Sequence, residues 1–246
     1  MHEPVAIVMA AGKGTRMKSD LPKVLVPVLG RPMIEYVLDA LHAGGIARTI
    51  VVVGYRADLV RQTLAGQSRV EFATQTEQLG TGHAVQMCRE ALIGHDGPVM
   101  IVAGDSPMIR SESVARLLAE FRANPSACLL GTTHKADPFG LGRIVRDAQG
   151  EFTGIVEERD ATPDERRITE VNMSCYLFHG PDLLEALAKL EPKNAQGEYY
   201  LTDCPGLLRQ SGRPVRALAV LHPSEALSIN NPDELAAVEE AMRHER

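Results

Sequence analysis

The stretch "VAIVMAAGKGTRMKSDLPKVLVPV", residues 5–28, decides the fold. It begins with an apolar run of the kind found in buried strands and then breaks into Ala-Ala-Gly-Lys-Gly. One acid, Asp20, stands among four cations, which are Lys13, Arg16, Lys18 and Lys23. A strand that leads into a basic, glycine-rich loop predicts an anion-binding turn at the edge of an α/β sheet.

The rest of the chain does not share this basic character. Its 246 residues include 26 Lys and Arg against 32 Asp and Glu, which gives a net charge of −6. This acidic balance argues against binding to nucleic acid or to a membrane surface, so the local positive charge suits a small anion. No apolar run reaches the ~20 residues of a membrane span, and no signal peptide precedes the first strand. We expect a cytoplasmic protein whose four cysteines, which lack C-x-x-C spacing, are reduced and buried.

The first half of the sequence alternates between strand-like and helix-like segments. Apolar, β-branched runs predict strands over 5–9, 49–53, 70–72, 98–102 and 127–132. Helical spacing predicts helices over 32–42, 57–64, 82–92 and 111–122, the last one capped by Ser111. Apolar strands that alternate with helices predict a Rossmann-like α/β fold, with a mostly parallel sheet covered by helices on both faces.

The second half has a mixed character. A hairpin is predicted around "AQG", with strands over 142–147 and 151–156. Further elements are expected over 170–178, 181–190, 200–210, 215–220 and 232–243. We expect a single domain over 1–246, with a first lobe over about 1–135 and a smaller, more antiparallel lobe over 136–246.

The glycine loop matches neither of two common phosphate-binding motifs. G-x-G-x-x-G would require glycine where Met17 stands, and no acid follows the second strand at Val53-Gly54-Tyr55. The Walker motif fails because Lys13 lies between the two glycines. We therefore predict a triphosphate cradle of another kind, while composition alone leaves open a solvated turn with scattered surface cations.

A resemblance carried by seven ordered motifs covers nearly the whole chain. "AAGKGTRMKSDLPKVL", residues 10–25, resembles the signature loop of the sugar-1-phosphate nucleotidylyltransferases, and within them the uridylyltransferase domain that acts on N-acetylglucosamine-1-phosphate. The other motifs are "EQLGTGHAVQ" (77–86), "GDSPMI" (104–109), "GLGRIVRD" (140–147), "GIVEERDAT" (154–162), "NAQGEYYLTD" (194–203) and "INNPDEL" (229–235). The resemblance implies the nucleotide-diphospho-sugar transferase fold, with a nucleotide-binding first lobe and a sugar-binding second lobe.

The implied reaction is attack by a sugar-1-phosphate on the α-phosphate of UTP, which releases pyrophosphate with Mg²⁺ as cofactor. By resemblance, Arg16 and Lys23 are catalytic, and Asp105 and Asn230 are the metal ligands. Asp105 follows a predicted strand, whose carboxyl end faces the ligand crevice, and hard oxygen donors suit Mg²⁺. The alternatives are surface cations for the first pair and turn or helix caps for the second.

The resemblance also divides the remaining site residues between the two substrates. The nucleotide side comprises Ala10, Ala11, Gly12, Gly14, Gln75, Gly80 and Thr81, and the sugar side comprises Gly142, Glu157 and Asn172. An amide and backbone groups suit the edge of a base, whereas a carboxylate and an amide suit sugar hydroxyls. A helix entry at Gly80-Thr81 and an exposed strand-end acid at Glu157 are the alternatives.

The sequence departs from the family pattern on the sugar side. Ala103 and Leu141 stand where the family commonly has tyrosine, and Met173-Ser174 replaces Thr-Gly. The sugar is therefore left open. No hexapeptide repeat of an acetyltransferase β-helix follows, so we expect a natural end after the last helix, no acetyl transfer, and a monomer or homodimer.

Two other functions stay open beside the uridylyltransferase. One is a nucleotidylyltransferase that uses another triphosphate, such as CTP, or another sugar or alcohol phosphate. The other is a non-catalytic module that binds nucleotide sugars. Neither nucleic acid nor membrane is expected among the partners, which are UTP and a sugar-1-phosphate.

Overall fold

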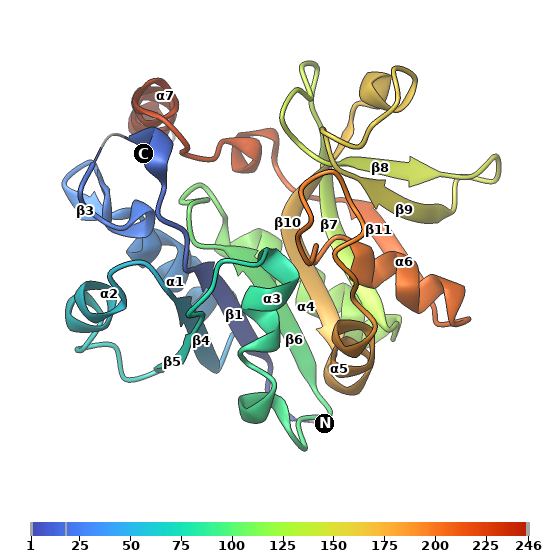
Figure 1. Ribbon diagram of the computed structural model, residues 1–246, viewed down its shortest axis with the longest axis horizontal. Helices are drawn as coiled ribbons and strands as arrows, with labels where there is room; N and C mark the ends of the chain where they lie inside the picture. The colour runs from blue at the N-terminus through green and yellow to red at the C-terminus, as the bar shows by residue number, and fades with distance from the viewer. Residues whose placement is uncertain (1, 18, 245–246) are drawn as a thin grey trace.

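Strand β1 (Val5–Ala10) lies at the point where the strand order of the sheet reverses (Figure 1). It pairs in parallel with β4 (Arg48–Val53) on one side and with β6 (Pro98–Ala103) on the other. Strand β5 (Val70–Thr74) continues the sheet in parallel beyond β4. The computed structural model describes residues 2–17 and 19–244, so Lys18 lies outside the described residues. Because ligands bind at the carboxyl ends of strands beside such a reversal, the loop after β1 is in the expected place for a binding site.

The second half of the chain completes the sheet with antiparallel pairs. Strand β10 (Glu170–His179) runs antiparallel to both β6 and β7 (Cys128–His134). Strand β11 (Val215–Ala219) pairs in parallel with β7 at the edge, and the hairpin of β8 (Arg143–Arg146) and β9 (Phe152–Val156) attaches to β10. In the described part of the chain, the main path runs β11-β7-β10-β6-β1-β4-β5.

Helices cover both faces of the sheet. One face packs against α1 (Met33–Ala43), α2 (Ala57–Thr63) and α4 (Ser111–Ala123). The other face packs against α3 (Thr81–Gln86), α5 (Gly180–Ala188) and α6 (Asp203–Gln210). The strand period of two divides β1 between the two cores, since Val5 and Ile7 join one and Ala6 and Val8 join the other. The predicted Rossmann-like fold is confirmed.

The C-terminal helix α7 (Pro232–His244) returns to the N-terminal part of the molecule (Figure 1). It contacts the small hairpin of β2 (Pro27–Val28) and β3 (Arg31–Pro32), and Glu239 Oε1 accepts a 2.9 Å hydrogen bond from the Leu29 amide. A separate, methionine-rich core lies beneath it, formed by Met17, Val26, Val28, Met33, Met108, Ile229, Val238 and Met242. This packing brings the last segment of the chain beside the glycine loop.

One helix expected over 82–92 is wrong in length. Helix α3 ends at Gln86, and a separate 3-10 turn follows over Glu90–Leu92. Gln86 Nε2 donates 2.8 Å to the Leu187 carbonyl of α5, and the amides after it bond three residues back, as from Cys88 to Val85. The α-helix therefore gives way to turns with bonds to the third residue back, beside the contact with α5.

Helix α4 begins at Ser111, as predicted, but its predicted cap is wrong, and so is the predicted start of α6; the reason is shared. Ser111 does not cap α4; the cap position is Arg110, whose amide donates 2.9 Å to the carboxylate of Glu225. Helix α6 begins at Asp203 rather than at residue 200, because the preceding segment docks on α3, with Leu201 N 3.0 Å from Thr81 Oγ1. Partners far along the chain set both boundaries.

The four cysteines are free and buried, as predicted; they are Cys88, Cys128, Cys175 and Cys204. Burial raises the pKa of the Cys88 thiol to about 12, which keeps it protonated and unreactive at neutral pH. Across residues 2–17 and 19–244, no helix combines the length and the hydropathy of a membrane span.

Candidate active site

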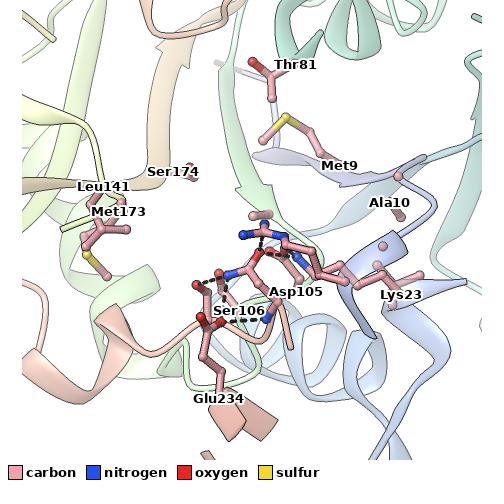
Figure 2. A pocket seen from close by; sticks show the side chains of 18 of the residues that line it. Met9, Ala10, Lys23, Thr81, Asp105, Ser106, Leu141, Met173, Ser174 and Glu234 are labelled. Carbon is pink, nitrogen blue, oxygen red and sulfur yellow. Dashed lines mark hydrogen bonds and ion pairs between the residues drawn. The ribbon is translucent and has the colours of Figure 1, made fainter. Parts of the chain in front are cut away.

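A cleft of about 790 Å³ opens at the carboxyl ends of β1 and β6 (Figure 2). Both halves of the chain line it. The predicted residues that line it are Ala10, Ala11, Gly12, Gly14, Arg16, Lys23, Gln75, Gly80, Thr81, Asp105, Asn172 and Asn230. Its volume lies within the usual range for small-molecule sites, roughly 300–1,000 Å³.

Four of these side chains form a charged centre in the cleft. The Lys23 ammonium contacts Asp105 Oδ2 and lies 2.7 Å from Asn230 Oδ1. Arg16 donates to the same Asn230 oxygen at 3.0 Å. The Lys23 and Asp105 side chains are only 13% and 24% exposed. Two cations and two oxygen donors that are distant in sequence therefore meet at one point, as expected from the sequence.

The glycine loop places Lys23 through close packing. Gly14 adopts φ +65°, and a Cβ added there would lie 2.6 Å from Lys23 Cβ. The loop then forms a 3-10 turn over Thr15–Met17, and a second one over Lys23–Leu25 begins at Lys23 itself. Gly14 thus makes room for the lysine stem as well as giving a phosphate access to the backbone. Lys13 lies over the Tyr55 ring, 5.3 Å from its centroid, and does not line the cleft.

The segment that carries Asn230 is anchored on two sides. Its Ile229 amide donates 3.2 Å to the Asp105 carbonyl. Upstream, the 3-10 turn over Pro223–Ala226 contains Glu225, which is 4% exposed. Its carboxylate accepts from the Arg110 amide, from Ser113 Oγ at 2.7 Å and from the His222 amide. A buried, fully hydrogen-bonded carboxylate therefore joins this segment to α4.

The donor set at the centre fits a magnesium ion. Asp105 and Asn230 each direct an oxygen at a single positive charge, the Lys23 ammonium. In the described residues, no three His, Cys, Asp or Glu side chains are grouped to cage a metal. Mg²⁺ binds through few protein oxygens and takes its remaining ligands from water and substrate phosphates, so two oxygens facing an open cleft suit it.

The predicted base-reading residues form a loop that is fixed by the second half of the chain. Gln75 is buried and donates 3.1 Å to the Gly80 carbonyl. Gly80 has φ +112°, and a Cβ there would lie 2.6 Å from the Tyr199 carbonyl, so only glycine fits. Thr81 Oγ1 accepts the Leu201 amide rather than capping its own helix. These contacts order the loop, and its recognition of uracil stays a prediction.

The predicted sugar side of the cleft includes an irregularity in β10. The register shifts between Asn172 and Tyr176, and Ser174 takes φ +48°. Asn172 Nδ2 donates 2.7 Å to Tyr176 Oη, and its Oδ1 accepts the Ser174 amide at 3.2 Å. The amide of Asn172 therefore closes the irregular turn. Figure 2 shows Leu141, Met173 and Ser174 on the side of the cleft opposite Lys23.

Gly142 and Glu157, the other predicted sugar-side residues, are not among the residues that line the cleft. The Gly142 carbonyl accepts the Asn172 amide at 2.8 Å, and a Cβ on Gly142 would lie 3.5 Å from Glu157 Oε2. Burial raises the pKa of Glu157, although a hydrogen bond from Thr202 and the charge of Arg143 oppose this. These two residues support the lining residues from behind.

Several lining residues were missed by the sequence analysis. They are Thr15, Gln78, Ser106, Lys135, Phe139, Glu198, Ser228 and Glu234. Phe139 offered a signal, because an aromatic residue stands in the polar loop "KADPFG", and in the structure this residue is 78% exposed. Glu234 offered another, since it stands three residues after Asn231 in a capping pattern.

The sheet, the reversal at β1 and the cleft define a nucleotide-diphospho-sugar transferase fold. A solved structure, UDP-glucose pyrophosphorylase complexed with UDP-glucose, superposes with a TM-score of 0.79 at 17% identity and covers 100% of both chains. The sequence matches the MobA-like NTP transferase domain over residues 6–203, and the chain belongs to this family, which confirms the predicted class.

The chain is also similar to curated full-length proteins. It is 46% identical over 243 residues to the bifunctional protein GlmU of Streptococcus suis (strain 98HAH33), covering 99% of this chain and 52% of that protein. It is 46% identical over 239 residues to the bifunctional protein GlmU of Streptococcus thermophilus (strain ATCC BAA-491 / LMD-9), covering 97% and 51%. The chain spans about half the length of these relatives.

Proposed function

We propose that this chain is a magnesium-dependent uridylyltransferase that converts UTP and a sugar-1-phosphate to UDP-sugar and pyrophosphate. The observation that carries the proposal is the meeting of Lys23, Arg16, Asp105 and Asn230 in one cleft. Both substrates are polyanions, so transfer depends on neutralising charge and on holding the attacking oxygen in line with the leaving group. The two cations can neutralise phosphate charge, and the two side-chain oxygens can bind a metal ion.

In the proposed reaction, a phosphate oxygen of the sugar-1-phosphate attacks the α-phosphorus of UTP, and the bond to the pyrophosphate oxygen breaks. Arg16, in the 3-10 turn that follows Gly14, binds the departing pyrophosphate. Lys23 contacts phosphate oxygens at the reacting centre. Asp105 and Asn230 would hold Mg²⁺, which neutralises phosphate oxygens when bound.

The two ends of the cleft are assigned to the two substrates. Residues 1–135 form the nucleotide-binding lobe, where Gln75 and the Gly80-Thr81 turn face the base. Residues 136–246 form the sugar-binding lobe, with Asn172 at the cleft and Gly142 and Glu157 behind it. The resemblance to the uridylyltransferase domain and the 46% identity to proteins named GlmU support N-acetylglucosamine-1-phosphate as the first acceptor to test, in a cytoplasmic enzyme.

A substrate panel tests the proposal. The purified chain is incubated with Mg²⁺, each of UTP, CTP, TTP, ATP and GTP, and each of several sugar-1-phosphates, and pyrophosphate release is measured. We expect the highest kcat/KM for UTP with N-acetylglucosamine-1-phosphate. Faster release with another pair would reassign the substrate, and tight binding of UDP-sugar without release from any pair would make the chain a binding module.

A further inference from the structure

The amide of Asn230 is held from the side opposite the cations. Glu234 Oε2 accepts the Asn230 backbone amide at 2.7 Å and its side-chain Nδ2 at 2.9 Å. The second hydrogen of Nδ2 is directed at Ser228 Oγ, 3.2 Å away. Both side-chain hydrogens are therefore used away from the charged centre, and Oδ1 is left to face Lys23 and Arg16 (Figure 2 shows Glu234 below this group).

The opposite orientation of this amide would be unfavourable at both ends. With the amide reversed, its NH₂ group would face the Lys23 ammonium, and its oxygen would face the Glu234 carboxylate. Neither contact could form a hydrogen bond, and hydrogen bonds to charged groups are among the stronger ones in proteins. The carboxylate therefore determines which end of Asn230 faces the cleft.

We infer that Glu234 is a positioning residue, which orients Asn230 so that its oxygen is presented to the cations and to the metal. The part that concerns the metal rests on the proposed function, whereas the orientation itself does not. Partners that orient a ligand from behind typically change metal affinity or activity by about 10- to 100-fold when removed.

Glu234 has a second task that the test must separate from the first. Its Oε1 accepts from Asn231 Nδ2 at 2.8 Å, and its backbone amide donates 3.0 Å to Asn231 Oδ1. This reciprocal pair caps the start of α7. The two tasks use different oxygens, so Asn231→Ala removes the cap and leaves the contacts between Glu234 and Asn230 in place. It is the matched control for Glu234→Ala.

The orientation is measured first, without metal or substrate. The side-chain amide of Asn230 is assigned in ¹⁵N–¹H NMR spectra by its loss in Asn230→Ala, and its hydrogen exchange is followed. We expect slow exchange in the wild type and in Asn231→Ala, fast exchange in Glu234→Ala, and an intermediate rate in Glu234→Gln, which keeps one acceptor. Slow exchange in Glu234→Ala would overturn the inference.

The consequence is measured next, as Mn²⁺ binding by electron paramagnetic resonance in the presence of UDP. Glu234→Ala should weaken Mn²⁺ binding by about 10- to 100-fold, and Asn231→Ala should leave it unchanged, although Asn231→Ala loses both bonds of the helix cap and Glu234→Ala loses only one. An equal loss in the two variants would reduce Glu234 to a capping residue. A wild-type chain that releases no pyrophosphate would contradict the proposed function alone, because the exchange experiment still decides the orientation.

Discussion

The two ends of the cleft use their polar groups in different ways. At the predicted phosphate end, Lys23 and Arg16 both donate to the side-chain oxygen of Asn230 in the cleft, and the Glu234 contact that holds Asn230 lies behind it. At the predicted sugar end, the side-chain amide of Asn172 bonds to Tyr176 and Ser174, and Leu141 and Met173 are among the residues that line the cleft. The polar groups of the first end therefore meet in the cleft, whereas those of Asn172 are used within the fold of β10.

The largest effect should come from the phosphate end. Asp105→Ala removes a proposed metal ligand and the partner of Lys23, and kcat should fall by about 10³-fold, because metal stabilisation of the transition state amounts to several kcal/mol. Pyrophosphate release measures kcat, and thermal unfolding serves as the control, since Asp105 is partly exposed and its loss should leave the fold intact. Turnover like that of the wild type would exclude the proposed mechanism.

The glycine that makes room for Lys23 should give the next largest effect. Gly14→Ala places a Cβ against the lysine stem at a positive φ, which should cost about 1–2 kcal/mol in the free energy of unfolding. Displacement of the ammonium by about 1 Å should lower kcat by up to about 10²-fold.

A matched stability control for that variant is Gly12→Ala. An added Cβ at Gly12 meets no atom within 4 Å, so its free energy of unfolding should stay within about 0.5 kcal/mol of the wild type. Equal destabilisation by the two substitutions would show that the loop is held by something other than the contact between Gly14 and Lys23.

The sugar end should respond in selectivity rather than in rate. Met173→Ala removes apolar surface that would contact an acetamido methyl group, so kcat/KM for N-acetylglucosamine-1-phosphate should fall by about 10-fold relative to glucose-1-phosphate. The ratio of the two kcat/KM values is the measurement. If both sugars lose equally, Met173 only fills space beside the site.

The smallest expected effect is on the pH dependence of stability and comes from Glu157, which lies behind the predicted sugar side of the cleft. The pKa of Glu157 lies above the unfolded value of 4.5, chiefly because the carboxyl is buried. Between these two pKa values the folded protein holds a proton that the unfolded chain releases, so the free energy of unfolding falls as the pH rises through that window. Glu157→Gln should remove this slope, measured by urea unfolding between pH 4 and 8.

The neighbouring residue gives the control of opposite sign. The hydrogen bond from Arg143 holds the pKa of Glu158 below 4.5, so its stabilisation is present above the unfolded pKa and is lost as the pH falls. Glu158→Gln should therefore remove stability at neutral pH and flatten the acid side of the profile. Matching profiles for the two variants would contradict their assigned environments.

The sequence predicted those structural features that are determined by residues close together in the chain. The apolar runs correctly predicted where the strands lie. The glycine loop, Lys23 and Asp105 pointed to one end of the cleft, where Lys23 and Asp105 are in contact. Both predictions depend only on short segments of sequence. The capping of α4 escaped prediction, since donors of its first turn are satisfied by Glu225, 112 residues from Ser113. The irregular turn at Ser174 escaped for a similar reason, because it depends on how β10 pairs with β7.

The C-terminal segment that carries Asn230 packs beside the N-terminal loop that carries Lys23, and this has a consequence for folding during synthesis. Lys23 and Asn230 are 207 residues apart, and β1, β4, β5 and β6 leave the ribosome long before the segment that carries Asn230. A nascent chain can therefore fold its glycine loop while its centre still lacks one oxygen donor. If the proposed function holds, a product truncated before residue 230 should lack that oxygen donor and release no pyrophosphate.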